Sequence, residues 1–208
     1  MTAGVRRGRG RPTDARGDET RRRVVSVAIS VFAEHGYARG GMRAIADEAG
    51  VTASALYNYF PSKASLYGAA WAVAMGEVYD EYESAVAGQD SLADELHAVI
   101  ERAAVMIRER PWIPTFGLSA ALDAARPDLR DHLPPPTSVG AFLRSLSARA
   151  LERGEIDDAE RRLLETYVSV LLWGISAVSR YDERALTAAV EAARWSVEKR
   201  FVDPSPAR

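Results

Sequence analysis

The chain has 208 residues, of which 47% are hydrophobic and 27% charged, a balance typical of a soluble globular protein with a sizeable core. It contains no cysteine, which excludes disulfides, thiolate chemistry and cysteine-based zinc sites, and its three histidines do not share metal-ligand spacing. The net charge of −2 is divided unevenly, because residues 1–63 hold eleven Lys or Arg against six Asp or Glu, and the remainder is acidic. A basic N-terminal segment on an acidic body suits contact with nucleic-acid phosphates.

Periodicity predicts an all-α chain, with no strand and no internal repeat. Residues 1–17 are rich in Gly and Arg, have no period, and are expected to form a flexible basic arm. Prolines between 112 and 136 predict a loop-rich section with one or two short helices. The other predicted helices span 18–35, 42–49, 53–60, 62–87, 91 to about 110, 138–153, 157 to about 180, and 182–201.

No segment predicts export or a membrane span. The first residues are polar and lack the apolar core of a signal peptide. The longest apolar run, 166–179, is interrupted by serines and is too short to cross a bilayer. We therefore expect a cytoplasmic protein without a membrane partner.

The most informative pattern lies in residues 45–63, where two short helices are joined by a tight turn. Gly50 supplies the positive φ that such a turn requires, Thr52 is a good N-cap, and Pro61 ends the second helix. This pattern is typical of a helix-turn-helix, whose second helix enters the major groove of DNA. The apolar residues expected to pack between the two helices are Ile45, Ala46, Ala49, Val51, Leu56 and Phe60.

At these residues the chain resembles the TetR family of bacterial transcriptional regulators. The resemblance implies a three-helix DNA-binding head, residues 18–64, continuous with a larger helical body, residues 65–208, that binds an effector and dimerises. It covers about residues 18–66 directly. The matching segments are Phe32-Ala33-Glu34-His35-Gly36-Tyr37, Met42-Arg43-Ala44-Ile45-Ala46, Ala49-Gly50-Val51 and Leu56-Tyr57-Asn58-Tyr59-Phe60-Pro61-Ser62-Lys63.

The resemblance also implies which residues contact double-stranded DNA. Asn58 suits adenine, Arg43 suits guanine, and the alanines suit thymine methyl groups. Tyr57 and Tyr59 fit either DNA contact or packing. The expected phosphate contacts are Thr52, Tyr59 and Lys63, and the residues expected to face bases are Arg43, Ala53, Ser54, Ala55, Tyr57 and Asn58.

Two further features of the head concern glycine. The segment Arg9-Gly10-Arg11-Pro12 resembles an AT-hook, in which Arg9 and Arg11 would lie in a narrow A·T minor groove. A solvated basic tail that contacts phosphates diffusely explains it equally well. The family usually has a Thr/Ser pair before the second helix, where this chain has Gly40-Gly41, so a phosphate contact there is in doubt.

The body is expected to hold an effector pocket and a dimer interface. Residues 166–179 are apolar nearly all round, so that helix must be buried on more than one face. The resemblance pairs it and the last helix with their copies in a four-helix dimer interface. His97, Arg102 and Arg108 suit either polar contacts to an effector or a solvated helix face. The candidate pocket residues are Trp71, Met75, Ile100, Met106, Trp112, Phe116, Tyr167 and Leu171.

These observations predict a homodimeric, ligand-responsive transcriptional regulator. The favoured form is a repressor released from a palindromic operator by a small, mostly apolar molecule. The alternative is an architectural or global DNA-binding protein without an effector. No cofactor, metal or enzymatic activity is expected, because the sequence has no nucleophile–base pair, metal cluster or phosphate-binding glycine loop.

Overall fold

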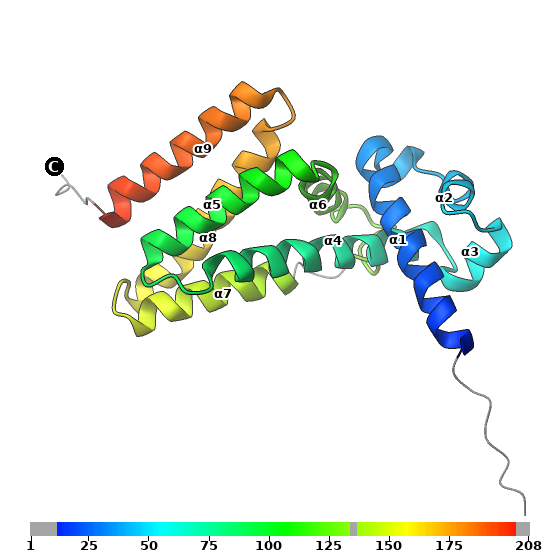
Figure 1. Ribbon diagram of the computed structural model, residues 1–208, viewed down its shortest axis with the longest axis horizontal. Helices are drawn as coiled ribbons and strands as arrows, with labels where there is room; N and C mark the ends of the chain where they lie inside the picture. Colours follow the sequence, from blue (N-terminus) through cyan, green and yellow to red (C-terminus); the bar gives the residue numbers. More distant parts are fainter. Residues whose placement is uncertain (1–11, 134–136, 203–208) are drawn as a thin grey trace, which may run out of the picture.

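The computed structural model describes residues 12–133 and 137–202, and it describes only the backbone of residues 12–15 and 137. In these residues the regular structure is entirely helical, which confirms the predicted all-α class. Figure 1 shows an elongated molecule with α1–α3 gathered at one end, while α4 leaves them and runs along the body. The helices of that end are α1 (Pro12–Arg39), α2 (Met42–Glu48) and α3 (Ala53–Tyr59).

The body is built from longer helices, several of which begin with a side-chain cap. Ser91 accepts a hydrogen bond from the Asp94 N–H, and the Asp157 and Glu160 side chains form a reciprocal capping box. The helix bounds are α4 (Lys63–Val86), α5 (Leu92–Glu109), α6 (Trp112–Asp123), α7 (Thr137–Glu152), α8 (Asp158–Val178) and α9 (Glu183–Val197), followed by a π-helical end, η1 (Glu198–Val202).

The head packs around α1, whose buried stripe meets α2. Val24 and Ala28 of α1 are completely buried, as are Ile45 of α2 and Leu56 of α3. Arg23 fastens the arrangement, because its Nε donates to the carbonyl of Ala49 at the end of α2, at 2.9 Å. This bond satisfies one of the carbonyls that a helix C-terminus leaves without an intrahelical partner.

A cluster of aromatic rings joins the head to the body. The ring centres of Phe32 on α1 and Tyr67 on α4 lie 4.8 Å apart, and Phe116 on α6 lies 5.2 Å from Tyr67. The Tyr67 hydroxyl donates to Asp123 at 2.8 Å, which ties α4 to the end of α6. Phe32, Tyr67 and Phe116 are fully buried, so the three helices share one core.

Ion pairs add a second set of connections within the body. Glu81 on α4 pairs with Arg110 and, at 2.8 Å, with Nε of Arg102 on α5. The hydrogen bond from Arg110 lowers the pKa of the Glu81 carboxyl, and Arg102 lowers it further. Glu95 is only 1% exposed and accepts a hydrogen bond from Nε of Arg149 on α7 at 2.7 Å. The buried carboxylate is therefore compensated, as burial of a charge requires.

The first and last helices differ from the sequence-based expectation, and α1 also continues to Arg39 beyond the predicted end at 35, with non-helical backbone angles at Gly36. The first helix begins at Pro12 rather than at 18, because proline is well suited to the first turn of a helix, where its missing N–H is not needed. In the loop-rich section the prediction of one or two short helices is confirmed, because α6 occupies 112–123, tolerates Pro114 in its first turn, and is followed by turns. The last helix changes from α to π geometry at Glu198.

Candidate nucleic-acid interface and body cavity

The turn between α2 and α3 has the geometry that the sequence predicts. Gly50 has a φ of +64°, a left-handed conformation that glycine adopts without a Cβ penalty. The Val51 N–H donates to the Ala46 carbonyl at 3.0 Å and closes the end of α2. Thr52 caps α3, because its hydroxyl accepts a hydrogen bond from the Ala55 N–H at 3.1 Å. These bonds fix the angle at which α3 leaves the turn.

The inner side of α3 is buried and its outer side faces solvent. Leu56 and Phe60 are 0% and 3% exposed and pack into the core, as predicted. Tyr57 is 51% exposed. The structure brings most of the predicted base contacts together on this outer side and on the neighbouring part of α2. The exposed members are Arg43, Ala53, Ser54, Tyr57 and Asn58, with Thr52 beside them, while Ala55 is half-buried.

The outer side of α3 carries small side chains in its first turn and therefore protrudes little from the helix backbone. Ala53 and Ser54 precede Tyr57 by one turn, so the first turn of α3 presents little bulk. A helix with this profile can approach the floor of a groove closely, and few of its side chains reach the bases with hydrogen-bonding groups. Asn58 and Arg43 are the members with strong hydrogen-bonding capacity.

Lys63, at the start of α4, is placed by the end of α1. Its Nζ donates to the Ala38 carbonyl at 3.1 Å and lies 4.7 Å from the centre of the Tyr37 ring. The guanidinium of Arg126 also lies over that ring, 5.2 Å from its centre. Burial, and secondarily the positive charge of Arg126, lowers the pKa of Lys63. An ammonium has three N–H groups, so the bond to Ala38 does not preclude a phosphate contact.

The other predicted head residues divide into two groups. Tyr59 is half-buried, and its hydroxyl lies beside Gly17 of α1, where a Cβ would be 3.8 Å away. This placement accounts for Tyr59 by packing, while its contact with DNA remains a prediction. Arg9 and Arg11 lie outside the described residues, and so does most of the predicted basic arm.

Gly40 and Gly41 have different surroundings although they are adjacent. A Cβ on Gly40 would lie 2.6 Å from the Phe32 ring, so the backbone approaches that ring too closely for a side chain. Gly41 is the N-cap of α2 and provides no side-chain cap, and a Cβ there would meet nothing within 4 Å. The glycine pair therefore combines one residue required by packing with one that is not.

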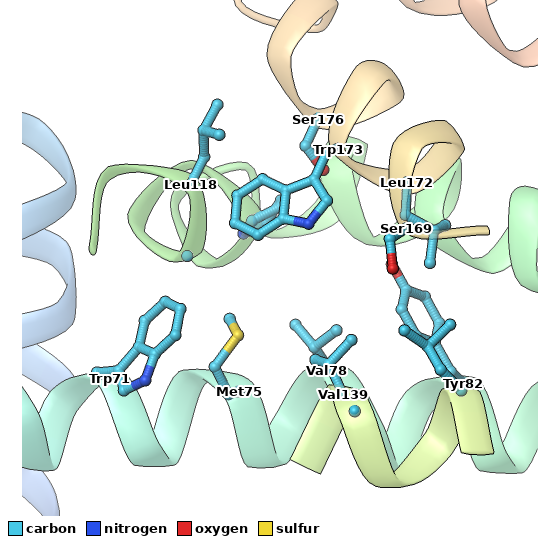
Figure 2. A pocket seen from close by; sticks show the side chains of 14 residues that line it. Trp71, Met75, Val78, Tyr82, Leu118, Val139, Ser169, Leu172, Trp173 and Ser176 are labelled. Carbon is cyan, nitrogen blue, oxygen red and sulfur yellow. The ribbon is translucent and has the colours of Figure 1, made fainter. Parts of the chain in front are cut away.

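The body contains a cavity of about 170 Å³ between α4, α6, α7 and α8. Figure 2 shows side chains from α4 and α8 pointing into it from opposite sides. Its lining is mainly aliphatic and aromatic, with two serine hydroxyls. The lining residues are Trp71, Met75, Val78, Tyr82, Pro114, Gly117, Leu118, Val139, Gly140, Leu143, Ser169, Leu172, Trp173 and Ser176.

The structure brings two of the predicted pocket residues, Trp71 and Met75, into this lining and places the others elsewhere. Tyr167 borders a separate hollow between α8 and η1 and shares a hydrogen bond with Ser196 at 2.6 Å. The others lie outside both linings. The fully buried ones are Ile100, Met106 and Phe116, and the partly buried ones are Trp112 and Leu171.

The predicted polar contacts to an effector also lie outside the cavity lining. Arg102 pairs with Glu81, and Arg108 pairs with Glu183 at 2.8 Å. His97 lies 3.5 Å from Glu198. Among the described residues, no three His, Asp or Glu side chains cluster as a metal site would require. None of the described helices combines the length and apolarity needed to cross a membrane.

Sequence reasoning missed most of the cavity lining, although a spacing signal was present. Trp71, Met75, Val78 and Tyr82 repeat at intervals of four, three and four residues on one side of α4. Intervals of three, one and three residues place four further lining residues on one side of α8. They are Ser169, Leu172, Trp173 and Ser176. Periodicity identifies such sides, but it does not indicate that they face a space instead of a neighbouring side chain.

A capped turn at Gly50 and a second helix with a solvent-facing outer side define a helix-turn-helix DNA-binding protein. The sequence profile described as "Bacterial regulatory proteins, tetR family" matches residues 24–70. Residues 24–70 are thus similar to the TetR family of transcriptional regulators, and the relatives and solved structures described below extend this similarity into the body.

The relatives include regulators of opposite sign. The HTH-type transcriptional repressor KstR of Mycolicibacterium smegmatis is 25% identical over 162 residues, which are 76% of this chain and 76% of that protein. The HTH-type transcriptional activator FasR of the same organism is 44% identical over 64 residues, 31% of this chain and 27% of that protein. The second match spans less than a third of either chain.

Solved structures share the fold over nearly their whole length. A TetR transcriptional regulator from Chloroflexus aurantiacus superposes with a TM-score of 0.73 at 22% identity, covering 90% of this chain and 96% of that one. The regulator FadR from Bacillus subtilis, in complex with stearoyl-CoA, gives a TM-score of 0.69 at 16% identity, covering 88% and 99%. At these identities the likeness concerns the arrangement of helices.

Proposed function

We propose that this protein is a homodimeric repressor, released from a palindromic operator when a small, mostly apolar molecule occupies the cavity between α4, α6, α7 and α8. The position of α6 carries the proposal. Leu118 of α6 lines the cavity, while the neighbouring Phe116 lies 6.3 Å from the Phe32 ring of α1. A molecule that displaces α6 therefore acts on α1, against which α2 packs.

The release requires that the effector bind the DNA-free conformation more tightly than the DNA-bound one. Linkage then demands that DNA weaken effector binding by the same factor as the effector weakens DNA binding. Repression is favoured over activation because the similarity to KstR, named a repressor, covers 76% of this chain, whereas the similarity to FasR, named an activator, covers 31%.

The proposed dimer forms through the outer sides of α8 and α9. Leu163 and Val170 are 69% and 64% exposed and lie seven residues apart on one side of α8. Trp195 on α9 is 66% exposed. An apolar surface of this extent favours a protein partner, and a second copy of the chain covers it by two-fold symmetry. The same symmetry presents two α3 helices to two half-sites of an operator.

Molar mass in solution tests this interface. Val170→Glu places a charge at its centre and is expected to convert the dimer into monomers in light scattering after size-exclusion chromatography. Leu122→Glu is the matched control, because Leu122 is 72% exposed but lies on α6, away from the interface. A Val170→Glu protein that stays dimeric contradicts the assignment of this surface.

DNA binding tests the proposed function as a whole. A labelled duplex from the region upstream of the gene is compared with a scrambled duplex of the same composition across a salt series. The expected result is preferential, steeply salt-dependent binding of two protomers per two-fold axis of the site. Equal binding to both duplexes in this assay, together with broad genomic occupancy, supports the architectural alternative and contradicts an operator-specific repressor.

The basic arm adds a separate expectation. Deleting residues 1–12 removes four arginines and is expected to weaken operator binding and to flatten its dependence on salt. A minor-groove hook predicts a larger loss on duplexes with A·T-rich flanks than on G·C-rich ones, whereas diffuse phosphate contact predicts equal losses. An unchanged salt slope contradicts both forms of arm contact.

A further inference from the structure

The cavity in the body is lined without formal charge. None of the described residues that border it is an Asp, Glu, Lys, Arg or His. Its one acidic hydroxyl is that of Tyr82, and burial raises the pKa of this phenol, so the group stays protonated at neutral pH. A carboxylate, phosphate or ammonium group placed inside would lose its hydration without gaining an ionic partner from this lining.

The size of the cavity also limits which ligands it can hold. Its volume of about 170 Å³ is close to that of the engineered apolar cavities, about 150 Å³, that bind benzene. It is smaller than the roughly 300–1,000 Å³ of pockets that enclose drug-sized ligands. Trp71 and Trp173 border it from α4 and α8, and Figure 2 shows both indoles pointing into the space between these helices. Flat side chains on two sides suit a flat occupant.

Two hydroxyls of α8 provide the polar part of the lining. Ser169 and Ser176 are two helical turns apart, and both border the cavity. The Ser169 hydroxyl donates to the Glu165 carbonyl at 2.8 Å, so toward a ligand this oxygen acts as an acceptor. A ligand with one hydroxyl or N–H group can therefore be oriented by α8 while its apolar part lies against α4.

We propose that the cavity binds an uncharged, single-ring aromatic molecule carrying one neutral hydrogen-bond donor. This proposal rests on the proposed function for the role of the cavity as an effector site, and it adds the chemical class of the effector. It also separates this protein from FadR of Bacillus subtilis, whose solved complex holds stearoyl-CoA. A CoA phosphate finds no basic residue in the described lining.

Three probes that share one ring and differ in charge test this proposal on the full-length protein. Benzyl alcohol is neutral, benzoate is an anion and benzylamine is a cation at neutral pH. Binding is measured by titration calorimetry and by the fluorescence of the cavity tryptophans. Benzyl alcohol is expected to bind at least about tenfold more tightly than either charged probe. Equal or tighter binding of benzoate, benzylamine or stearoyl-CoA overturns the proposal, as does absence of saturable benzyl alcohol binding up to its solubility.

A matched pair of variants locates the binding. Leu118→Trp fills the cavity from α6 and is expected to abolish saturable benzyl alcohol binding. Leu122→Trp adds the same side chain one turn further along α6, at an exposed position outside the lining, and is expected to bind as the wild type does. Benzyl alcohol binding that survives Leu118→Trp in a folded protein, judged by circular dichroism, contradicts the proposed location. The comparison of the three probes uses only the wild-type protein, so its outcome does not depend on whether a variant folds.

Failure of this proposal is distinguishable from failure of the proposed function. Neutral-probe selectivity without any effect on operator binding supports the ligand class and contradicts effector control of DNA. Release from the operator by a charged amphiphile, with no selectivity for benzyl alcohol, supports effector control and overturns the ligand class.

Discussion

The DNA-facing side of the head and the cavity of the body differ in how their residues come together. The head places its candidate contacts on α2, α3 and the start of α4, within about twenty consecutive residues. The cavity is lined by residues of α4, α6, α7 and α8, and these lining residues lie between positions 71 and 176. A site made by consecutive short helices is encoded by local spacing, whereas a site between distant helices depends on how those helices pack.

The two regions also differ in electrostatics. The head presents Arg43 and Lys63 near its outer surface, which suits an anionic polymer, while the described cavity lining has no charge. Between them lies the aromatic cluster of Phe32, Tyr67 and Phe116, which is neutral and fully buried. Under the proposed function, the two regions recognise different chemistry, and the aromatic packing is what connects them.

The largest expected effect is at the junction of the two regions. Phe32→Ala removes a fully buried ring that contacts both α4 and α6, and it is expected to lower the free energy of unfolding by about 3–5 kcal/mol. Urea unfolding followed by circular dichroism measures this loss. Leu122→Ala is the exposed control, with an expected change within about 0.5 kcal/mol. A loss below about 1 kcal/mol for Phe32→Ala would mean that the junction repacks easily.

Within the head, Asn58 and Lys63 are expected to affect DNA binding in different ways. Asn58→Ala is expected to weaken binding to the operator by about 1–3 kcal/mol and to relax preference at one base pair. Lys63→Ala is expected to weaken binding to operator and scrambled duplexes alike and to reduce the salt slope by about one. Fluorescence anisotropy across a salt series measures both. Equal loss on both duplexes for Asn58→Ala contradicts its assignment to a base.

The two glycines before α2 separate packing from capping. Gly40→Ala places a Cβ against the Phe32 ring and is expected to destabilise the protein by about 1–3 kcal/mol, measured by thermal and urea unfolding. Gly41→Ser adds an N-cap hydroxyl in open space and is expected to change stability by only about a few tenths of a kcal/mol, in the stabilising direction. The reverse order of effects would contradict the close approach of Gly40 to Phe32.

In the body, Glu81 predicts a dependence of stability on pH. Because folding lowers the pKa of this carboxyl below its usual 4.5, its contribution is complete above that value and is lost as the pH falls through the folded value. Glu81→Gln is expected to lower stability at pH 7 by about 1–2 kcal/mol and to make the acid loss shallower. Unfolding at a series of pH values measures this difference. Parallel pH profiles for variant and wild type contradict the role of the ion pairs.

The sequence predicts the head in detail because its determinants are local. Three local features fix α2 and α3 without any contribution from the body. They are the glycine at the turn, the threonine whose hydroxyl accepts a hydrogen bond from the N–H three residues later, and apolar residues at helical spacing. The buried positions of Leu56 and Phe60 follow from the same spacing. The identity of the DNA contacts stays a prediction, because exposure places a residue on the surface and does not show what it touches.

The cavity could not be predicted in the same way. Phe116, Gly117 and Leu118 are consecutive on α6, yet Phe116 packs against Tyr67 while Gly117 and Leu118 border the cavity. Residue type and period indicate which side of a helix is apolar, but a filled core and an empty space have the same apolar lining. Of the apolar residues of the body that the resemblance suggested as pocket lining, Trp71 and Met75 border the cavity.

The sequence by itself determined the all-α class, the capped turn at Gly50 and the division of charge between head and body, because each depends on neighbours in the chain. Only the tertiary structure decided where space remains between α4, α6, α7 and α8, that Gly40 must be a glycine for Phe32 to fit, and that α6 contacts both the cavity and α1. These features depend on side-chain volumes meeting across long separations in sequence, which no local pattern records.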